Sequence, residues 1–373
     1  MAKVICIYSE KGGSAKTTTA FSLAYILKNK FKKHVILYDS DFQASLSKRF
    51  GLTEEAIKEQ NIKTVKDLYF DDNIQAKDLI YKVEDNLSVI FSNPEMKDEI
   101  ARVKPTQQLL KPKKVLGNYF KSLPNDYFII IDVVGVNNNI SASALYLASH
   151  VLITLNAGLM SLNELEPSLR SIDDVYDSDT DSPKKLGILL CNSKDKTGVV
   201  NFTKEKIKEN PDVYDTFVYD VVIRNSNDIP DSEYNGMDIN TFLGNFDYKV
   251  VKFKVISKKD MEKFKKMTKE NKASEIFNRI AIPKKITSGL ELPKEAYDYK
   301  IKYRTDDKLI KIKDNKMNID KCPYGKYESK LFIDIIDINN ITYSFELTIK
   351  IVKDNVGYDY VRFAEELLDK IGD

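Results

Sequence analysis

Two lysines, two glycines and three threonines gather within residues 10–20, EKGGSAKTTTA, between an apolar run, VICIY, and a helix-like run, FSLAYIL. A strand that ends in a glycine-rich turn and continues as a helix leaves several backbone N–H groups pointing at one spot, with the positive end of the helix dipole behind them. Such a spot binds phosphate. We therefore predict a phosphate-binding loop made of Gly12, Gly13, Ser14, Ala15, Lys16, Thr17 and Thr18.

Two side chains of this loop have predicted roles of their own. Lys16 adds a positive charge for the β and γ phosphates of a nucleotide, and the hydroxyl of Thr17 lies in the first helical turn, where it ligates Mg²⁺. Ala15 replaces the glycine that would precede the lysine in the pattern G-x-x-x-x-G-K-[ST], so that a Cβ crowds the turn. The loop therefore needs support from other segments.

Three aspartates follow apolar runs that read as strands. Asp39 and Asp41 lie in YDSDFQAS, and Asp132 ends YFIIID. Ligands of open α/β folds bind at the carboxyl ends of the strands, so these carboxylates are expected beside the phosphates. Asp132 is predicted to reach Mg²⁺, and the other two to hold a Mg²⁺-bound water and to orient or activate the attacking water. Gly135 lets the segment VVGVNNNIS approach the γ-phosphate as a switch.

A further apolar run, LGILLCNSKDKT, ends in Asn192, which is placed to hydrogen-bond a base. A guanine site prefers the order N-K-x-D, whereas this chain has N-S-K-D. We therefore predict ATP, with Mg²⁺, as the bound nucleotide.

Composition excludes several classes of protein. The chain has 373 residues, 42% hydrophobic and 31% charged, which suits two or three globular domains. No apolar stretch has membrane-spanning length and no signal-peptide core is present, so we expect a cytoplasmic protein that does not enter a membrane. Three cysteines and two histidines offer no spacing for a disulfide framework or a zinc site. DSDTDS at 177–182 lacks the glycine of a calcium loop and reads as a linker.

Apolar strand-like runs alternate with helix-like segments up to about residue 245, which predicts a mostly parallel sheet flanked by helices. Then follow a lysine-rich helical segment from Ser257 to about Ile280, alternating runs typical of antiparallel strands, and a last amphipathic helix. We predict an α/β P-loop NTPase domain at 1–246, an inserted α+β domain at 247–353, and a terminal helix at 354–373 that returns to the ATPase domain.

These segments resemble the ParA/MinD family of partition and positioning ATPases. KGGSAKTT matches the deviant Walker-A pattern K-G-G-x-x-K-[ST], and YDSDFQASLS is similar to the family's D-x-D-P-Q segment with Phe42 in place of proline. The resemblance covers residues 1–245 and the last twenty. It implies that Lys11 reaches the phosphates of the opposite subunit in a nucleotide-sandwich dimer, and that Asp41 orients the hydrolytic water.

The branch that the chain resembles most is the DNA partition ATPases without an N-terminal helix-turn-helix domain. The resemblance implies an ATP-dependent homodimer on nonspecific DNA, a nucleoid-associated location, and slow hydrolysis stimulated by a ParB-like centromere-binding protein. Asn225 and Asp228 occupy positions where the chromosomal branch has DNA-contacting arginines, and Arg224 comes one residue early. Residues 249–272 contain ten lysines and three acids, so this helical segment is a candidate replacement.

Three other functions use the same fold. A MinD-like ATPase that positions itself on membranes is disfavoured, because the last helix is net acidic. An enzyme of metabolic or redox chemistry, such as an amidoligase relative or the nitrogenase iron protein, is another, and the iron protein needs cluster cysteines that are absent. A nucleotide switch with weak hydrolysis that acts through the insert, or a positioning ATPase for a protein cargo, stays open.

Overall fold

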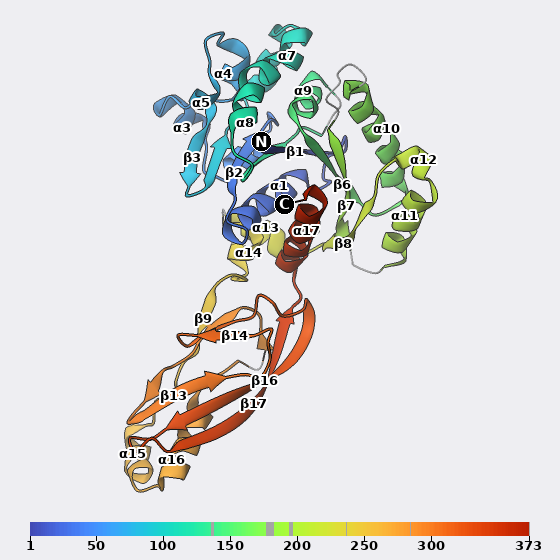
Figure 1. The fold of residues 1–373 in the computed structure, drawn as a ribbon. Coiled ribbons are helices and arrows are strands. Elements are labelled where there is room, and N and C mark those ends of the chain that lie inside the picture. The colour runs from blue at the N-terminus through green and yellow to red at the C-terminus, as the bar shows by residue number, and fades with distance from the viewer. Residues whose placement is uncertain (136–137, 177–182, 194–196, 236, 284, 373) are drawn as a thin grey trace. The chain divides into compact units, whose positions relative to one another are not determined.

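The computed structural model describes residues 1–135, 138–176, 183–193, 197–235, 237–283 and 285–372 (Figure 1). The chain divides into two compact units. The N-terminal unit comprises residues 1–239 and 359–373, and the insert unit comprises residues 240–358. The end of the chain therefore belongs to the same unit as its beginning.

An eight-stranded sheet forms the centre of the N-terminal unit, in the order β3-β4-β2-β5-β1-β6-β7-β8. Neighbouring strands pair in parallel except β3, which pairs antiparallel with β4 at one edge. This confirms the predicted mostly parallel sheet and adds β3. The strands are β1 (Lys3–Tyr8), β2 (His34–Asp39), β3 (Tyr81–Glu84), β4 (Leu87–Ile90), β5 (Tyr127–Asp132), β6 (His150–Asn156), β7 (Lys184–Ser193) and β8 (Val218–Arg224).

Helices cover both faces of this sheet (Figure 1). On one face Phe120, Ala144 and Leu165, from three different helices, join a single apolar core. The other face carries α1, which contacts β1, β2 and β5. The helical segments are α1 (Lys16–Asn29), α2 (Ser45–Lys48), α3 (Glu54–Glu59), α4 (Val65–Phe70), α5 (Ala76–Leu79), α6 (Met96–Glu99), η1 (Ile100–Arg102), α7 (Pro105–Pro112), η2 (Lys113–Gly117), α8 (Asn118–Ser122), α9 (Asn139–Leu147), α10 (Leu159–Tyr176), α11 (Gly198–Glu209), α12 (Pro211–Tyr214) and α13 (Asp228–Tyr234).

Helices α14 (Ile239–Phe242) and α17 (Val356–Ile371) span the two points of the chain where the division between the units falls. Within the described part of the chain, no helix combines the length and the hydropathy needed to cross a bilayer.

Helix α17 packs its C-terminal part into the N-terminal unit. The ring of Phe363 is fully buried and meets Tyr219 of β8 edge-on, with 5.0 Å between centroids. Arg224 at the end of β8 donates from Nε and Nη2 to the two carboxylate oxygens of Asp359, at 2.6 and 2.9 Å. This bidentate pair and the aromatic contact fix the helix against β8.

We expect Asp359→Ala to lower the free energy of unfolding by about 2 kcal/mol, because it leaves the Arg224 guanidinium without the carboxylate that satisfies two of its donors. Denaturant unfolding followed by circular dichroism measures this change. Asp369→Ala removes an exposed acid from the last turn of the same helix and is expected to change the value by less than about 0.5 kcal/mol. Equal effects of the two substitutions would contradict the structural role of the pair.

The insert unit contains two further sheets, ordered β10-β17-β16-β13-β12 and β14-β15-β11-β9. In β13 buried and exposed residues alternate strictly, as predicted for strands with one face in water. The strands are β9 (Tyr248–Val250), β10 (Lys285–Ile286), β11 (Gly289–Glu291), β12 (Glu295–Ala296), β13 (Tyr299–Arg304), β14 (Lys311–Lys313), β15 (Lys316–Asn318), β16 (Gly325–Ile336) and β17 (Thr342–Lys353).

The lysine-rich segment of the insert unit forms two helices, α15 (Lys258–Lys265) and α16 (Lys269–Arg279), and not one continuous helix as the sequence analysis predicted. Ser257 caps α15, with its hydroxyl accepting a bond from the N–H of Asp260 at 3.2 Å. Thr268 caps α16 in the same way. The second cap ends the first helix, because Thr268 takes an extended backbone conformation.

Candidate nucleotide-binding site

The phosphate loop lies where β1 ends, at Tyr8, and α1 begins, at Lys16. Gly13 and Ala15 both have left-handed backbone conformations, with φ of 74° and 66°. Glycine adopts this conformation freely, whereas for Ala15 it costs about 1–2 kcal/mol. The Cβ of Ala15 was expected to crowd the turn. The loop accommodates it at the start of α1 through a strained backbone conformation.

Lys16 is buried and is bonded within its own loop. Its ammonium donates to the carbonyl oxygen of Lys11 at 2.8 Å. Burial lowers the pKa of Lys16, while the nearby carboxylates of Asp132 and Asp41 oppose this shift. A phosphate oxygen is a stronger acceptor than a neutral carbonyl, so a bound polyphosphate competes well for this ammonium.

Gly135 approaches the loop from the end of β5. A Cβ at this position would lie 2.9 Å from the Nζ of Lys16 and 3.2 Å from both the backbone N of Gly12 and the carbonyl oxygen of Lys11. Such contacts require glycine. The segment after β5 thus reaches the loop as the switch interpretation expects, although residues 136–137 of that segment lie outside the described residues.

Asp39 and Asp132 are direct neighbours in the register of β2 and β5. Burial raises the pKa of both carboxyls, and the charge of Asp132 raises that of Asp39 further. Asp39 accepts bonds from the N–H and the hydroxyl of Ser47, at 2.8 and 2.7 Å. By contrast, neither oxygen of Asp132 makes a hydrogen bond of normal geometry within the described residues, although the nearby hydroxyl of Thr17 offsets part of the rise in its pKa. Asp132 is thus the carboxylate with oxygens available to a cation.

The other predicted residues of the loop and its surroundings are placed as follows. Thr17 is half-buried in the first turn of α1. The hydroxyl of Thr18 donates to Glu233 at 2.7 Å and accepts from Arg49 at 3.2 Å. Its backbone N–H belongs to the first turn of α1, whose N–H groups have no partner within the helix. Asp41 is half-buried, and its Oδ1 accepts a bond from the N–H of Gln43 at 2.9 Å.

Two asparagines hold the loop from the ends of neighbouring strands. Asn192 donates to the carbonyl oxygen of Gly13 at 3.2 Å and to the side-chain oxygen of Asn156 at 3.1 Å. Asn156 donates to the same Gly13 carbonyl at 3.3 Å. Asn192 was predicted from the sequence, whereas Asn156 was not. The observation that could have found Asn156 is that it ends the apolar run HVLITLN.

Lys11 is tied to a distant helix. Its Nζ lies 2.9 Å from Oε1 of Glu164 on α10, and the two side chains are 40% and 35% exposed. The other oxygen of Glu164 is buried without a hydrogen-bond partner among the described residues. Glu164 was not predicted, because it follows Lys11 by 153 residues and carries no local signal.

The segment compared with the DNA-contacting arginines begins at the end of β8. Arg224 is bound to Asp359 of α17, and Asp228 is the first residue of α13 and accepts a bond from the Ser226 hydroxyl at 2.8 Å. Arg224 therefore holds the terminal helix in place.

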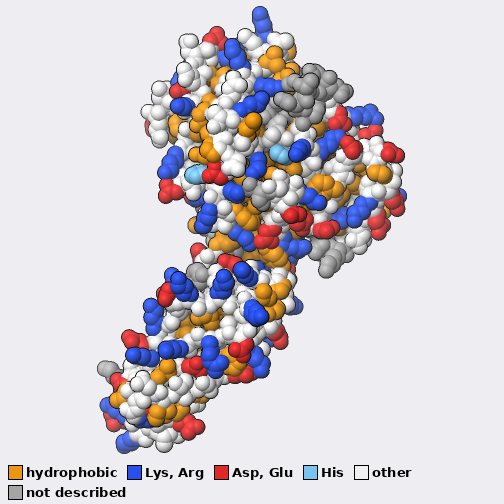
Figure 2. Space-filling view, in the orientation of Figure 1, with side chains coloured by type: hydrophobic (Ala, Val, Ile, Leu, Met, Phe, Trp, Pro, Cys, Tyr) orange, Lys and Arg blue, Asp and Glu red, His pale blue; other side chains and the backbone are white. Residues whose placement is uncertain are grey.

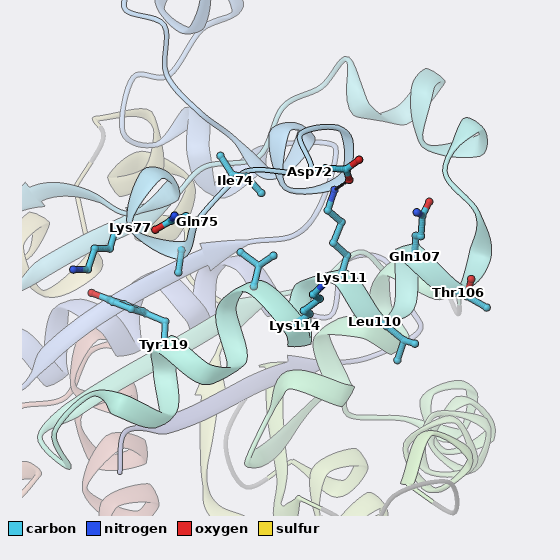
Figure 3. Close-up of a pocket in the computed structure, with 12 residues that line it drawn as sticks. Asp72, Ile74, Gln75, Lys77, Thr106, Gln107, Leu110, Lys111, Lys114 and Tyr119 are labelled. Atoms are coloured by element: carbon cyan, nitrogen blue, oxygen red, sulfur yellow. Dashed lines mark hydrogen bonds and ion pairs between the residues drawn. The ribbon is translucent and has the colours of Figure 1, made fainter.

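A second cavity, of about 750 Å³, lies beside α5, α7 and η2 (Figure 3). Its lining includes the apolar side chains of Ile74 and Leu110 and the lysines Lys77 and Lys114. Lys111, also in the lining, pairs with Asp72 at 3.0 Å. Its lining residues include none of the phosphate loop or of the three predicted aspartates. This cavity is separate from the nucleotide site.

The residues at the sheet edge fit a nucleoside triphosphate with a divalent cation. The first-turn N–H groups of α1 and the ammonium of Lys16 suit phosphate oxygens. The orphaned oxygens of Asp132 and the Thr17 hydroxyl are the oxygen ligands that Mg²⁺ prefers. A loop between a central parallel strand and a helix, with these groups around it, defines a P-loop NTPase.

Comparison with known proteins agrees with this class. Residues 2–186 match a family model described as an AAA domain. The chromosome partitioning protein ParA of Myxococcus xanthus is 27% identical over 210 residues, which are 55% of this chain and 70% of that protein. Apo McdA from Cyanothece has a TM-score of 0.52 and 22% identity over 65% of this chain and 94% of its own.

A second similar structure is cobyrinic acid a,c-diamide synthase from Mycobacterium smegmatis, with a bound ATP analogue and magnesium. It has a TM-score of 0.52 and 19% identity over 66% of this chain and 94% of its own. These matches support a ParA/MinD-type P-loop ATPase, as the resemblance seen in the sequence predicted.

Proposed function

We propose that this protein is a Mg-ATP-dependent ATPase that partitions DNA. The observation that carries the proposal is a pair of lysines on one phosphate loop, with Lys16 buried beneath it and Lys11 half-exposed and paired with Glu164. An exposed ion pair of this kind contributes little stability, so Lys11 is released at small cost. Facing a second copy of the chain, Lys11 reaches the phosphates held by that copy, and ATP binding thereby drives formation of a homodimer.

Bound Mg²⁺ would neutralise charge on the β and γ phosphates. Thr17 and Asp132 are the side chains that would hold it, because the oxygens of Asp132 have no other partner among the described residues. Asp39, predicted as a further ligand, accepts bonds from Ser47 and lies beside Asp132 in the register of the two strands. Asn192 lies beside the loop at the edge where the base is expected.

We assign to Asp41 the positioning of the attacking water, because its carboxylate lies at the same sheet edge with one oxygen held by the Gln43 N–H. The Asp41→Ala variant is expected to bind ATP normally but to hydrolyse it at least about 100-fold more slowly, and so to accumulate as the ATP-bound dimer. Phosphate release and size-exclusion chromatography with light scattering measure the two effects. Asp71→Ala, which changes an aspartate away from the site, is the control. Wild-type turnover by Asp41→Ala would contradict the assignment.

In this proposal the ATP-bound dimer binds nonspecific DNA, so the protein is cytoplasmic and nucleoid-associated. A ParB-like centromere-binding partner stimulates the slow hydrolysis and releases the dimer from DNA. Support comes from the family and from the similarity to a protein named for chromosome partitioning. The apolar stripe of α17 also supports it over a membrane-positioning role, because Tyr360, Phe363 and Leu367 are buried within the N-terminal unit.

A second candidate is a nucleotide switch or a protein-cargo positioning ATPase that acts through the insert unit. The separate apolar core of that unit, around Leu331, Ile333 and Ile351, favours this alternative because it can present a surface of its own.

The experiment that separates the two is binding to a random-sequence DNA duplex with ADP, ATP and a non-hydrolysable ATP analogue at two salt concentrations. Partition predicts ATP-dependent binding that weakens with salt. Nucleotide binding without any DNA binding would favour the second candidate, and loss of both would contradict the ATPase proposal itself.

A further inference from the structure

The two units carry opposite charge. The insert unit, residues 240–358, contains 26 lysines and arginines against 17 aspartates and glutamates, a formal charge of +9. The whole chain has only +2, so the N-terminal unit is at −7. A general richness in lysine would raise the charge of both units. The excess of positive charge is therefore a property of the insert unit, and Figure 2 shows lysine and arginine side chains spread over its surface.

Part of this charge lies on one face of the five-stranded sheet. Along β13, β16 and β17 alternate side chains are buried in the core, and the stacked rings of Phe277 on α16 and Phe345 on β17 place α16 on that inner side. The opposite side is the outer sheet face. Its charged side chains are Lys285, Lys300, Lys302, Arg304, Lys326, Lys330 and Lys350, with Glu295, Glu328, Asp334 and Glu346.

Some lysines of the outer sheet face form ion pairs and others do not. The acids Glu328, Asp334 and Glu346 pair with Lys350, Arg304 and Lys330, respectively. Lys300, Lys302 and Lys326 are exposed and have no ion-pair partner among the residues that the structure describes.

Lys285 lies directly opposite Lys350 in the register of β10 and β17. Glu328 offsets the charge of Lys350 at 3.0 Å, so that Lys285 adds a further positive charge to this edge of the face.

The outer sheet face fits a nucleic acid backbone better than a lipid surface. Its apolar members Phe332 and Ile336 are half-buried and Val352 is buried, and the guanidinium of Arg304 covers the ring of Phe332 at 4.4 Å, so that no large apolar side chain projects from this face. Duplex DNA carries one negative charge per about 1.7 Å of axis, and unpaired lysines spread along this face can contact its phosphates without any base contact.

We propose that the outer sheet face of the insert unit is the nonspecific DNA-binding surface of this protein. This inference rests on the proposed partition function and names the part of the chain that holds the DNA. It places the contacts on the sheet, whereas the sequence pattern pointed to the lysine-rich segment 249–272. It also explains how DNA is bound although Arg224, at the edge of the N-terminal unit, is paired with Asp359.

The test compares two full-length triple variants, each of which loses three positive charges. Lys300→Gln/Lys302→Gln/Lys326→Gln changes the outer sheet face, and Lys263→Gln/Lys265→Gln/Lys266→Gln changes exposed lysines of α15 and its end. Affinity for a random-sequence duplex is measured with ATP and Mg²⁺ at four salt concentrations, beside ATP affinity and basal turnover. We expect the sheet variant to bind DNA at least about tenfold more weakly and its salt slope to fall by about 2.7, while the helix variant keeps most of the wild-type slope.

Several results would overturn the inference. If the helix variant lost as much affinity as the sheet variant or more, the contacts would be diffuse or helical. If the wild-type protein bound DNA and the sheet variant bound it equally well, the sheet would have no role while the partition function stood. If the wild-type protein bound ATP but no DNA, the partition function would fail with it. Binding to vesicles of anionic phospholipid in place of DNA would assign the face, or the exposed Ile338 and Ile341 at the tip of the β16–β17 hairpin, to a membrane.

Discussion

The Lys16→Ala variant is expected to lose ATP binding, with an affinity at least about 100-fold below that of the wild-type protein. Lys16 is the buried positive charge beneath the phosphate loop, and its ammonium now donates to a carbonyl oxygen of the same loop at 2.8 Å. Without it, a polyphosphate would face the negative charges of Asp132 and Asp41 with only backbone N–H groups to offset them. Isothermal titration with Mg-ATP measures the affinity.

Lys30→Ala is the matched control for this prediction. Lys30 follows the last residue of α1 and pairs with Glu365 at 2.8 Å on the surface, so its loss changes the same helix without changing the loop. ATP affinity within about twofold of wild type is expected there. Thermal unfolding of both variants shows whether they fold. A folded Lys16→Ala protein that binds ATP as tightly as the control would contradict the assigned site.

The parts of the site that lie next to each other in the sequence were predictable from it. The phosphate loop combines glycines, a lysine and a threonine between a strand and a helix, and each type has one physical reason to be there. Asp39 and Asp132 were predicted because each ends an apolar run, and parallel strands bring such ends to one edge. The sequence could not tell the two apart, because only the fold brings Ser47 onto Asp39 and leaves Asp132 unpaired.

The contacts that link distant segments were not predictable. Glu164 and Asn156 carry no local pattern, and their roles come from the packing of α10 and β6 beside the loop. The strand β3 was missed because it is four residues long and half-exposed at the sheet edge. In the insert, composition drew attention to the lysine-rich helices, whereas the exposed lysines of the sheet are separated by apolar residues in the sequence and share one face only because side chains alternate along the strands.

The Lys11→Ala variant is expected to bind ATP within about threefold of wild type, but to form no ATP-dependent dimer and to show no turnover above background. The side chain of Lys11 is not buried beneath the loop as that of Lys16 is, but is partly exposed and pairs with Glu164. Its positive charge is therefore available to phosphates held by a second copy of the chain. We assign this contact across the dimer to no other described residue. Analytical ultracentrifugation with ATP and a phosphate-release assay measure the two losses.

Glu164→Gln separates this role from a structural one. The substitution keeps the shape of the side chain but removes the charge that holds Lys11, and an ion pair of this exposure contributes about 0.2–1 kcal/mol. Two such pairs break when the dimer forms, so we expect the ATP-bound dimer of Glu164→Gln to form at up to about 30-fold lower protein concentration than that of the wild type, with ATP affinity unchanged. If Lys11 served the fold of its own subunit, both substitutions would act alike and lower stability. Wild-type dimerisation and turnover in Lys11→Ala would rule out the proposed contact across the dimer, because the charge that completes the opposite site would then come from elsewhere.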